Sequence, residues 1–95
     1  MLLTRGRMVG YDSDRMTFRF TMMNEARIVD CEISSVALDD LDGEKGTRPV
    51  EREAQFKRLR DEIERITCGI FNNRGKNEES SGEVVRIFAK HVRNR

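Results

Sequence analysis

Two neighbouring stretches of the chain alternate between apolar and polar residues, and this pattern constrains the fold more than any other feature of the sequence. In residues 16–22 the apolar positions are Met16, Phe18, Phe20 and Met22. In residues 27–33 one side carries Val29, Cys31 and Ile33. Period-two alternation is typical of β-strands with one buried face. The sequence therefore predicts two half-buried strands close together in the chain.

The link between these stretches, Asn24-Glu25, predicts a β-hairpin. Asn tolerates the left-handed backbone that a two-residue type I′ turn requires. Pairing across this turn sets Arg19 opposite Asp30 and brings apolar residues together on the other face: Phe20 with Val29, Phe18 with Cys31, and Met16 with Ile33. Because Glu25 is an unusual second residue for such a turn, a longer loop with a shifted register is the alternative.

Two helices are predicted after the hairpin. Ser34 and Ser35 are both suitable N-caps, and Gly43 marks the end of a two-turn helix. Pro49 suits the first position of a long helix that continues to about Asn73. Apolar spacings of three and four residues define its inward stripe, which consists of Phe56, Leu59, Ile63, Ile66 and Ile70. The connector at residues 42–48 is expected to be mobile.

The remaining pattern predicts a polar, mobile loop at residues 74–82 and a final strand at residues 83–90. The predicted fold is therefore an α+β domain over residues 11–93, preceded by an N-terminal segment of residues 1–10. A small antiparallel sheet, made of the hairpin and the C-terminal strand, packs against the long helix, with the short helix after the hairpin. The predicted core comprises Phe18, Phe20, Val29, Cys31, Ile33, Leu59, Ile63 and Ile66.

Several of these elements follow a recognisable order. A Gly10-Tyr11-Asp12 motif precedes the first strand, Met16-Thr17-Phe18-Arg19-Phe20, and Val29-Asp30-Cys31-Glu32-Ile33 leads into Val36-Ala37-Leu38 and Leu41. In this order the chain resembles the bacterial family catalogued as domain of unknown function 1488, from Gly10 to about Phe88. The resemblance implies a compact bacterial α+β domain and no activity. The connector at residues 42–48 and the basic C-terminal end depart from the family pattern.

Overall charge and apolar content exclude several classes of protein. Lys and Arg number 18 against 17 Asp and Glu, so the formal charge of +1 produces no whole-molecule attraction for nucleic acid or anionic membranes. No apolar run approaches the roughly 18 residues of a membrane span, and the first ten residues are too polar for a signal peptide. We expect a cytoplasmic protein in which Cys31 and Cys68 are reduced thiols, because their spacing matches no metal or redox motif.

Titratable residues in the sequence form no catalytic or metal-binding constellation. His91 is the only histidine and is interpreted as a surface or edge-strand residue. Asp12 and Asp14 lack the Gly and closing Glu of a calcium loop and are interpreted as turn formers. The acidic group Asp39, Asp40, Asp42 and Glu44 suits a solvated helix end better than a divalent ion. No catalytic residue, metal ligand or cofactor is therefore predicted.

Basic residues near the C-terminus raise one binding hypothesis. A candidate anion-binding surface comprises Arg19, Arg86, Lys90, Arg93 and Arg95, which Arg5 and Arg7 join if the two ends converge. The alternative is a charged, solubilising tail. Phe18 and Phe20, and by the same argument Phe88, are interpreted as core residues and not as a base-stacking platform.

Function is predicted less sharply than fold. The leading hypothesis is a non-enzymatic binding or adaptor module that self-associates as a homodimer, because the final strand carries apolar groups on both faces. The alternative is weak binding of nucleic acid or another anion through the basic termini. An enzyme with a site assembled from scattered carboxylates and arginines is the third reading, and it requires a deep cleft with perturbed titratable groups.

Overall fold

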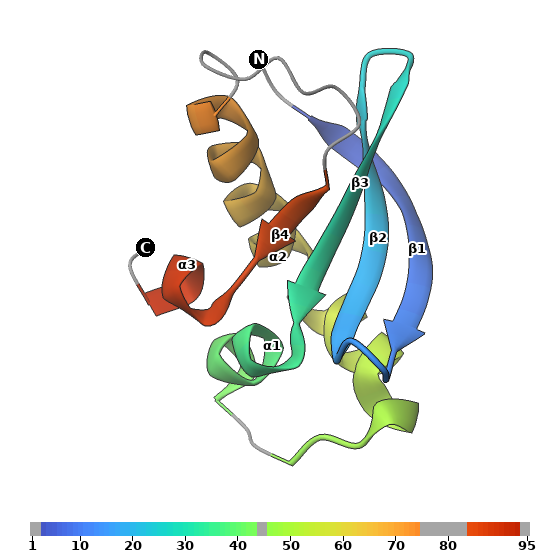
Figure 1. Ribbon diagram of the computed structural model, residues 1–95, viewed down its shortest axis with the longest axis vertical. Helices are drawn as coiled ribbons and strands as arrows, with labels where there is room; N and C mark the ends of the chain where they lie inside the picture. The colour runs from blue at the N-terminus through green and yellow to red at the C-terminus, as the bar shows by residue number, and fades with distance from the viewer. Residues whose placement is uncertain (1–2, 44–45, 75–83, 94–95) are drawn as a thin grey trace.

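The computed structural model describes residues 3–43, 46–74 and 84–93 of the 95-residue chain (Figure 1). Its elements are, in order, β1 (Thr4–Asp12), β2 (Thr17–Asn24), β3 (Arg27–Ser34), α1 (Ser35–Asp42), a 3-10 turn (Pro49–Glu51), α2 (Arg52–Arg74), β4 (Val85–Ile87) and α3 (Ala89–Arg93). The strands form one sheet in the order β1-β2-β3-β4. Strands β1 to β3 are antiparallel and β4 runs parallel to β3. The predicted α+β fold is confirmed, with a mixed sheet in place of an antiparallel one.

The β2-β3 hairpin is confirmed, but its predicted register is wrong by two residues. Asn24 pairs with Arg27, so Glu25 and Ala26 form the turn, and Glu25 takes the left-handed backbone at φ 59°. Phe18 lies opposite Ile33 and Phe20 opposite Cys31. Because side chains alternate with a period of two, a shift by two residues leaves Phe18, Phe20 and Met22 on their predicted buried face. Met16, predicted on the same face opposite Ile33, instead lies in the turn before β2 and is 58% exposed.

Strand β1 was not predicted, and two irregularities in its pairing explain why. The register with β2 shifts between Arg5 and Met8 and again between Met8 and Gly10. Such bulges break the period-two pattern that reveals a strand in a sequence. A Cβ at Gly6 would lie 2.4 Å from the carbonyl oxygen of Thr21, so this bulge needs glycine. Residues 4–10, expected to lie outside the domain, are therefore part of its sheet.

The final predicted strand is shorter than expected. Among the described residues of this segment, only Val85–Ile87 pair with β3, and Ala89–Arg93 form helix α3, so the strand predicted over residues 83–90 is corrected; residue 83 lies outside the described residues. A parallel pair needs a crossover connection that returns the chain to the same end of the sheet, and α1 and α2, which lie between β3 and β4, supply it. Phe88, predicted to be core, is 46% exposed.

Helix α2 covers one face of the sheet, as its stripe predicted (Figure 1). The Phe56 ring stacks on Phe18 at 4.5 Å between centroids and lies 5.0 Å from Phe20. Phe18, Phe20, Cys31, Ile33 and Ile63 are buried as predicted, and the partly buried Val29, Leu59, Ile66 and Ile70 pack against them. No helix in the described ranges is long and apolar enough to cross a membrane.

The short helix α1 begins and ends as predicted. The Ser34 hydroxyl accepts the Ala37 N–H at 3.1 Å, and Gly43 closes the helix at φ 75°. Asp42 is the last residue of α1 and Arg74 the last of α2, so both predicted loops begin later than expected. Residues 44–45 and 75–83 lie outside the described residues. Helices α1 and α3 contact each other beside β4 (Figure 1).

Candidate anion-binding site

One face of the sheet, which we call the outer sheet face, points away from α2. Phe18 and Phe20 contact Phe56 of α2, so the alternating residue Arg19 lies on the outer face. Strand pairing then places Gly10, Arg19, Glu32 and Arg86 in one row across β1, β2, β3 and β4. No described helix covers this row in Figure 1. Residues from four distant parts of the chain thus meet on an open surface.

Glu32 is the centre of this row, and its carboxylate is nearly buried. Its side chain is 8% exposed, and its Oε2 accepts hydrogen bonds from Arg15 Nη2 at 2.9 Å and Arg86 Nε at 3.0 Å. A buried carboxylate is costly unless it is paired and hydrogen-bonded. The two arginines meet this requirement, and the carboxylate in turn fixes the orientation of both guanidinium groups.

The turn between β1 and β2 brings Arg15 to the site. Asp12 Oδ1 accepts the backbone N–H of Asp14 at 3.0 Å and of Arg15 at 3.3 Å, an Asx turn that confirms the predicted role of Asp12. Met16 then takes a left-handed backbone at φ 55° before β2 begins. This tight reversal points Arg15 back across the sheet to Glu32.

Two guanidinium groups, from Arg15 and Arg86, therefore contact one carboxylate, and Arg19 lies opposite Glu32 on the neighbouring strand; we call these three arginines the arginine cluster. Each guanidinium has five N–H donors, and the bonds to Glu32 use one donor each from Arg15 and Arg86. About half of both side chains is exposed, and Arg19 is exposed without an ion pair among the described residues. The excess of positive charge and the remaining N–H donors of the guanidinium groups suit an oxyanion. The carboxylate of Asp30, in the next row of the sheet, reduces the positive potential at this surface.

The structure brings together only part of the predicted anion-binding surface. Arg19 and Arg86 share the outer sheet face, whereas Arg93 pairs with Asp40 of α1 at 3.0 Å. Lys90 lies on α3 beside a separate groove, and Arg95 is outside the described residues. Arg15 and Glu32 were missed, because their proximity depends on the turn and on the β3-β4 register. The Asx turn ahead of Arg15 is the one local signal that was available.

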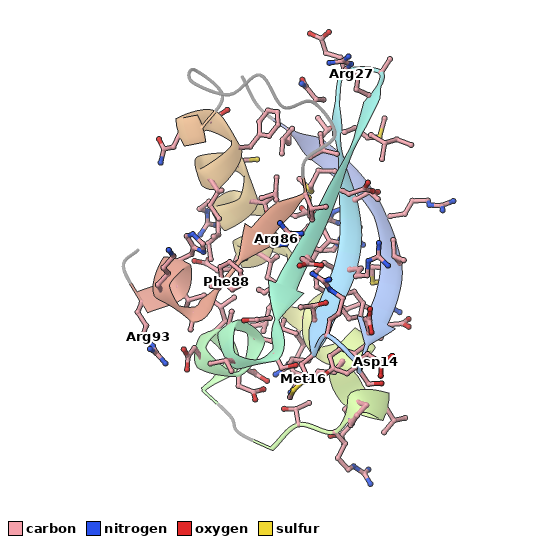
Figure 2. The ribbon with its side chains drawn as sticks, in the orientation of Figure 1. Asp14, Met16, Arg27, Arg86, Phe88 and Arg93 are labelled. Atoms are coloured by element: carbon pink, nitrogen blue, oxygen red, sulfur yellow. The ribbon has the colours of Figure 1, made fainter. Side chains whose placement is uncertain are left out.

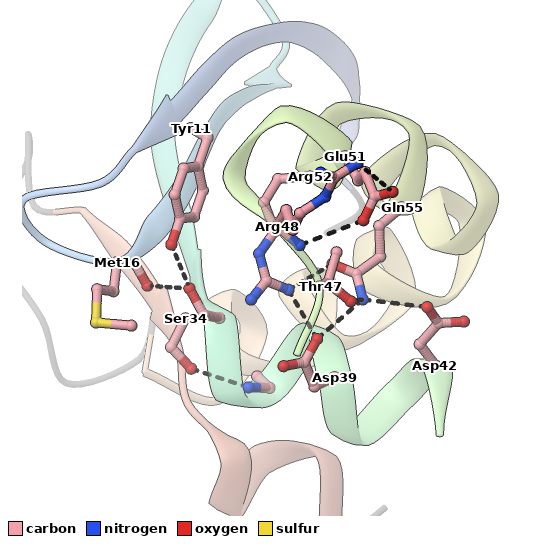
Figure 3. Close-up of polar contacts among 12 residues, drawn as sticks. Tyr11, Met16, Ser34, Asp39, Asp42, Thr47, Arg48, Glu51, Arg52 and Gln55 are labelled. Atoms are coloured by element: carbon pink, nitrogen blue, oxygen red, sulfur yellow. Dashed lines mark hydrogen bonds and ion pairs between the residues drawn. The ribbon is translucent and has the colours of Figure 1, made fainter. Parts of the chain in front are cut away.

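Asp39, Asp40 and Asp42 of the predicted acidic group are largely buried and form ion pairs within the fold, so the interpretation as a solvated helix end is corrected for them; Glu44 lies outside the described residues (Figure 3). Asp39 Oδ1 accepts from Arg52 Nη1 at 2.7 Å and from Gln55 Nε2 at 3.1 Å, and Asp42 pairs with Arg58 at 2.6 Å. Burial raises the pKa of Asp39, but the Arg52 and Gln55 hydrogen bonds and the Arg52 charge together lower this pKa below its usual value. No cluster of metal-binding side chains occurs among the residues described.

His91 has a structural role at the start of α3. Its Nδ1 accepts the Phe88 N–H at 2.8 Å, and its ring stacks on the Phe88 ring at 5.9 Å between centroids. Burial and the nearby Lys90 charge lower the pKa of His91. Protonation of Nδ1 would break this hydrogen bond, so the neutral imidazole is the form that holds the start of the helix.

A groove of about 740 Å³ lies between α2 and α3, outside the arginine cluster. Its lining residues are Glu62, Arg65, Ile66, Gly69, Ile70, Asn73, Lys90 and His91. A Cβ at Gly69 would meet nothing within 4 Å, so this glycine leaves open space on the face of α2. The thiol of Cys68, on the same helix, is half-buried and contacts the Leu3 carbonyl oxygen at 3.7 Å.

Comparisons with known proteins agree with this fold. A sequence family described as "Protein of unknown function (DUF1488)" matches residues 6–85. The chain belongs to the DUF1488 family. The resemblance noted in the sequence is thereby confirmed. The match includes residues 42–48, which were expected to depart from the family, and ends before Arg86 and Phe88.

A crystal structure from the DUF1488 family shares this architecture. It is a protein of unknown function from Shewanella loihica PV-4, with a TM-score of 0.71 at 17% sequence identity. The similarity covers 90% of this chain and 89% of that one. No curated protein matches the chain. The comparisons therefore establish the family and the fold, and the arginine cluster is the guide to function.

Proposed function

We propose that this DUF1488 protein is a non-enzymatic binding module that holds an anionic partner on its outer sheet face. The observation that carries the proposal is the arginine cluster, in which buried Glu32 orients Arg15 and Arg86 beside Arg19. Orienting the guanidinium groups in advance reduces the conformational entropy lost on binding. Charged groups with free donors on an open surface then favour an oxyanion.

Other reactive side chains support binding over catalysis because they already serve the fold. His91 accepts the Phe88 N–H, Asp39 accepts from Arg52, and the buried Cys31 thiol donates to the Val29 carbonyl oxygen at 3.5 Å. Cys31 and Cys68 are free thiols, the form favoured in a reducing compartment, which supports a cytoplasmic location.

The first prediction concerns Arg19. Titration of the ¹⁵N-labelled protein with inorganic tripolyphosphate is expected to shift the Nε signals of Arg15, Arg19 and Arg86. Arg19→Gln should weaken binding about tenfold or more, equivalent to roughly 1.5 kcal/mol for one hydrogen bond to a charged group. Binding should also weaken as salt is added.

Arg27→Gln is the matched control for this experiment. Arg27 is an exposed strand arginine at the hairpin tip, away from Arg86 (Figure 2). Its replacement by Gln removes the same charge as Arg19→Gln. Its affinity should stay within a factor of two of the wild type. Equal losses in the two variants, or shifts spread over all arginines, would contradict a specific site.

Self-association is a second candidate, favoured by the groove between α2 and α3. Its lining includes the half-buried Ile66 and Ile70 and charges of both signs, from Glu62 and Lys90. In a two-fold contact each copy offers the same surface, so Glu62 of one copy can face Lys90 of the other. The net charge of +1 opposes such a dimer only weakly.

Gly69→Lys tests this second candidate. Lys favours a helix more than Gly, and its side chain would enter open space, so the fold should be retained or slightly stabilised. Sedimentation velocity is expected to show a dimer for the wild type and a monomer for the variant. A wild type that remains monomeric at millimolar concentration would rule out self-association and leave the anion-binding proposal intact.

A further inference from the structure

The residue that extends the arginine cluster is Phe88, two positions after Arg86. Along this part of the chain Val85 and Ile87 are fully buried, whereas Arg86 and Phe88 are exposed. Because side chains alternate along an extended chain, Phe88 lies on the same side as Arg86. Strand β4 ends at Ile87, so Phe88 directly follows the strand, and Figure 2 shows it near Arg86. An exposed aromatic residue thus lies two positions from an arginine of the cluster.

The Phe88 ring is held in place although nearly half of the residue is exposed. It stacks on the His91 ring with 25° between the planes, and its backbone N–H donates to His91 Nδ1 at 2.8 Å. The His91 N–H in turn donates to the Phe88 carbonyl oxygen at 2.9 Å. These contacts restrict the ring while 46% of the residue remains open to solvent. A fixed, exposed aromatic ring suits stacking with a planar ligand.

We infer that the outer sheet face binds single-stranded nucleic acid, with a phosphate at Arg15, Arg19 and Arg86 and an adjacent base stacked on Phe88. The inference rests on the proposed function and specifies its ligand. Arg86 and Phe88 are two residues apart, a rise of about 6.6 Å along a strand. This spacing allows one nucleotide to reach both groups. Exposed sheet faces with aromatic side chains bind unpaired bases in this way, because the bases of a duplex are already stacked.

An acidic peptide is the competing ligand for the same arginines, but it leaves Phe88 without a role. A nucleotide uses both features, because it carries a phosphate for charge-assisted hydrogen bonds and an aromatic base for the ring. The single aromatic position and the nearby Asp30 predict modest affinity and little dependence on base sequence.

Fluorescence anisotropy with two labelled 12-mers separates the phosphate contribution from the base contribution. One probe is oligouridylate; the other is an abasic phosphodiester of the same length, with the phosphates but no bases. We expect oligouridylate to bind about tenfold more tightly, within the range for stacking of one base. Phe88→Leu should remove this advantage and leave abasic binding unchanged. Arg86→Gln should weaken the binding of both probes.

Ile28→Ala is the matched control for the loss of an exposed apolar side chain. Ile28 is 68% exposed at the hairpin end of the sheet, and its loss should change neither affinity. Amide spectra of each variant confirm that the fold is retained. Two results would overturn nucleic-acid recognition but leave the anion-binding proposal intact. In the first, both probes bind equally and Arg19→Gln weakens the binding of both. In the second, a 12-residue polyglutamate binds more tightly than oligouridylate. Failure of every anion to bind would overturn both proposals.

Discussion

Replacing Phe56 with alanine is expected to lower the free energy of unfolding by about 3–5 kcal/mol. The Phe56 side chain is fully buried and joins α2 to the sheet, with one ring neighbour stacked at 4.5 Å and the other at 5.0 Å. Its removal loses the transfer free energy of the ring and leaves a cavity between Phe18 and Phe20. The total free energy of unfolding of a domain of this size is about 5–15 kcal/mol, so the variant should be only marginally stable. Urea unfolding followed by circular dichroism measures the loss.

Val50→Ala is the control for Phe56→Ala. Val50 lies in the turn before α2 and is 78% exposed, so its truncation should change stability by less than about 0.5 kcal/mol. A loss below about 1 kcal/mol for Phe56→Ala would show that α2 does not pack on the sheet through this ring.

Replacing Asp39 with alanine is expected to lower the free energy of unfolding by about 3 kcal/mol, because it leaves the buried Arg52 guanidinium without its carboxylate partner. The Arg52 side chain is 6% exposed, and Asp39 is its one ion-pair partner in the described residues (Figure 3). Gln55 Oε1 still accepts from Arg52 Nη1 at 2.6 Å, but this neutral amide does not replace the charge. Chemical unfolding at pH 7 measures the change.

The same carboxylate predicts how stability depends on pH. Its pKa in the folded protein is below the usual value of 3.8, so its contribution is fully present above about pH 4. This contribution is lost as the pH falls from 3.8 toward the folded pKa, because the unfolded chain takes up the proton first. The stability difference between wild type and Asp39→Ala should therefore shrink in that range.

Two further variants separate the Asp39 effect from a general loss of ion pairing. Glu53→Ala removes an exposed carboxylate that lies 3.5 Å from Lys57, and it should cost no more than about 0.5 kcal/mol. Adding Arg52→Met to Asp39→Ala removes the stranded charge and should recover part of the lost stability. If the double variant were no more stable than Asp39→Ala, burial of the guanidinium would not be the cause.

The α+β class, the hairpin and helices α1 and α2 were predictable because their signals are local, whereas α3 was predicted as part of a strand. Strand faces are encoded by residues two apart, and the stripe of α2 by residues three and four apart. The Ser34 cap and the Gly43 terminus of α1 likewise depend on one or two residues. Each of these features is determined by chemistry within a few residues of chain, and the structure confirms them.

The binding surface depends on contacts that are distant in sequence. The irregular pairing of β1 hid that strand, and the turn at Glu25 and Ala26 moved the hairpin register by two residues. The crossover through α1 and α2 allows β4 to run parallel to β3, which places Arg86 beside Glu32, 54 residues earlier. The chain forms α3 directly after β4, and Phe88 between them is exposed. The sequence by itself determined which face the side chains of β2, β3 and α2 take. Only the tertiary structure decided which elements are neighbours, because strand order and register depend on packing of the whole domain, and that order assembles the arginine cluster.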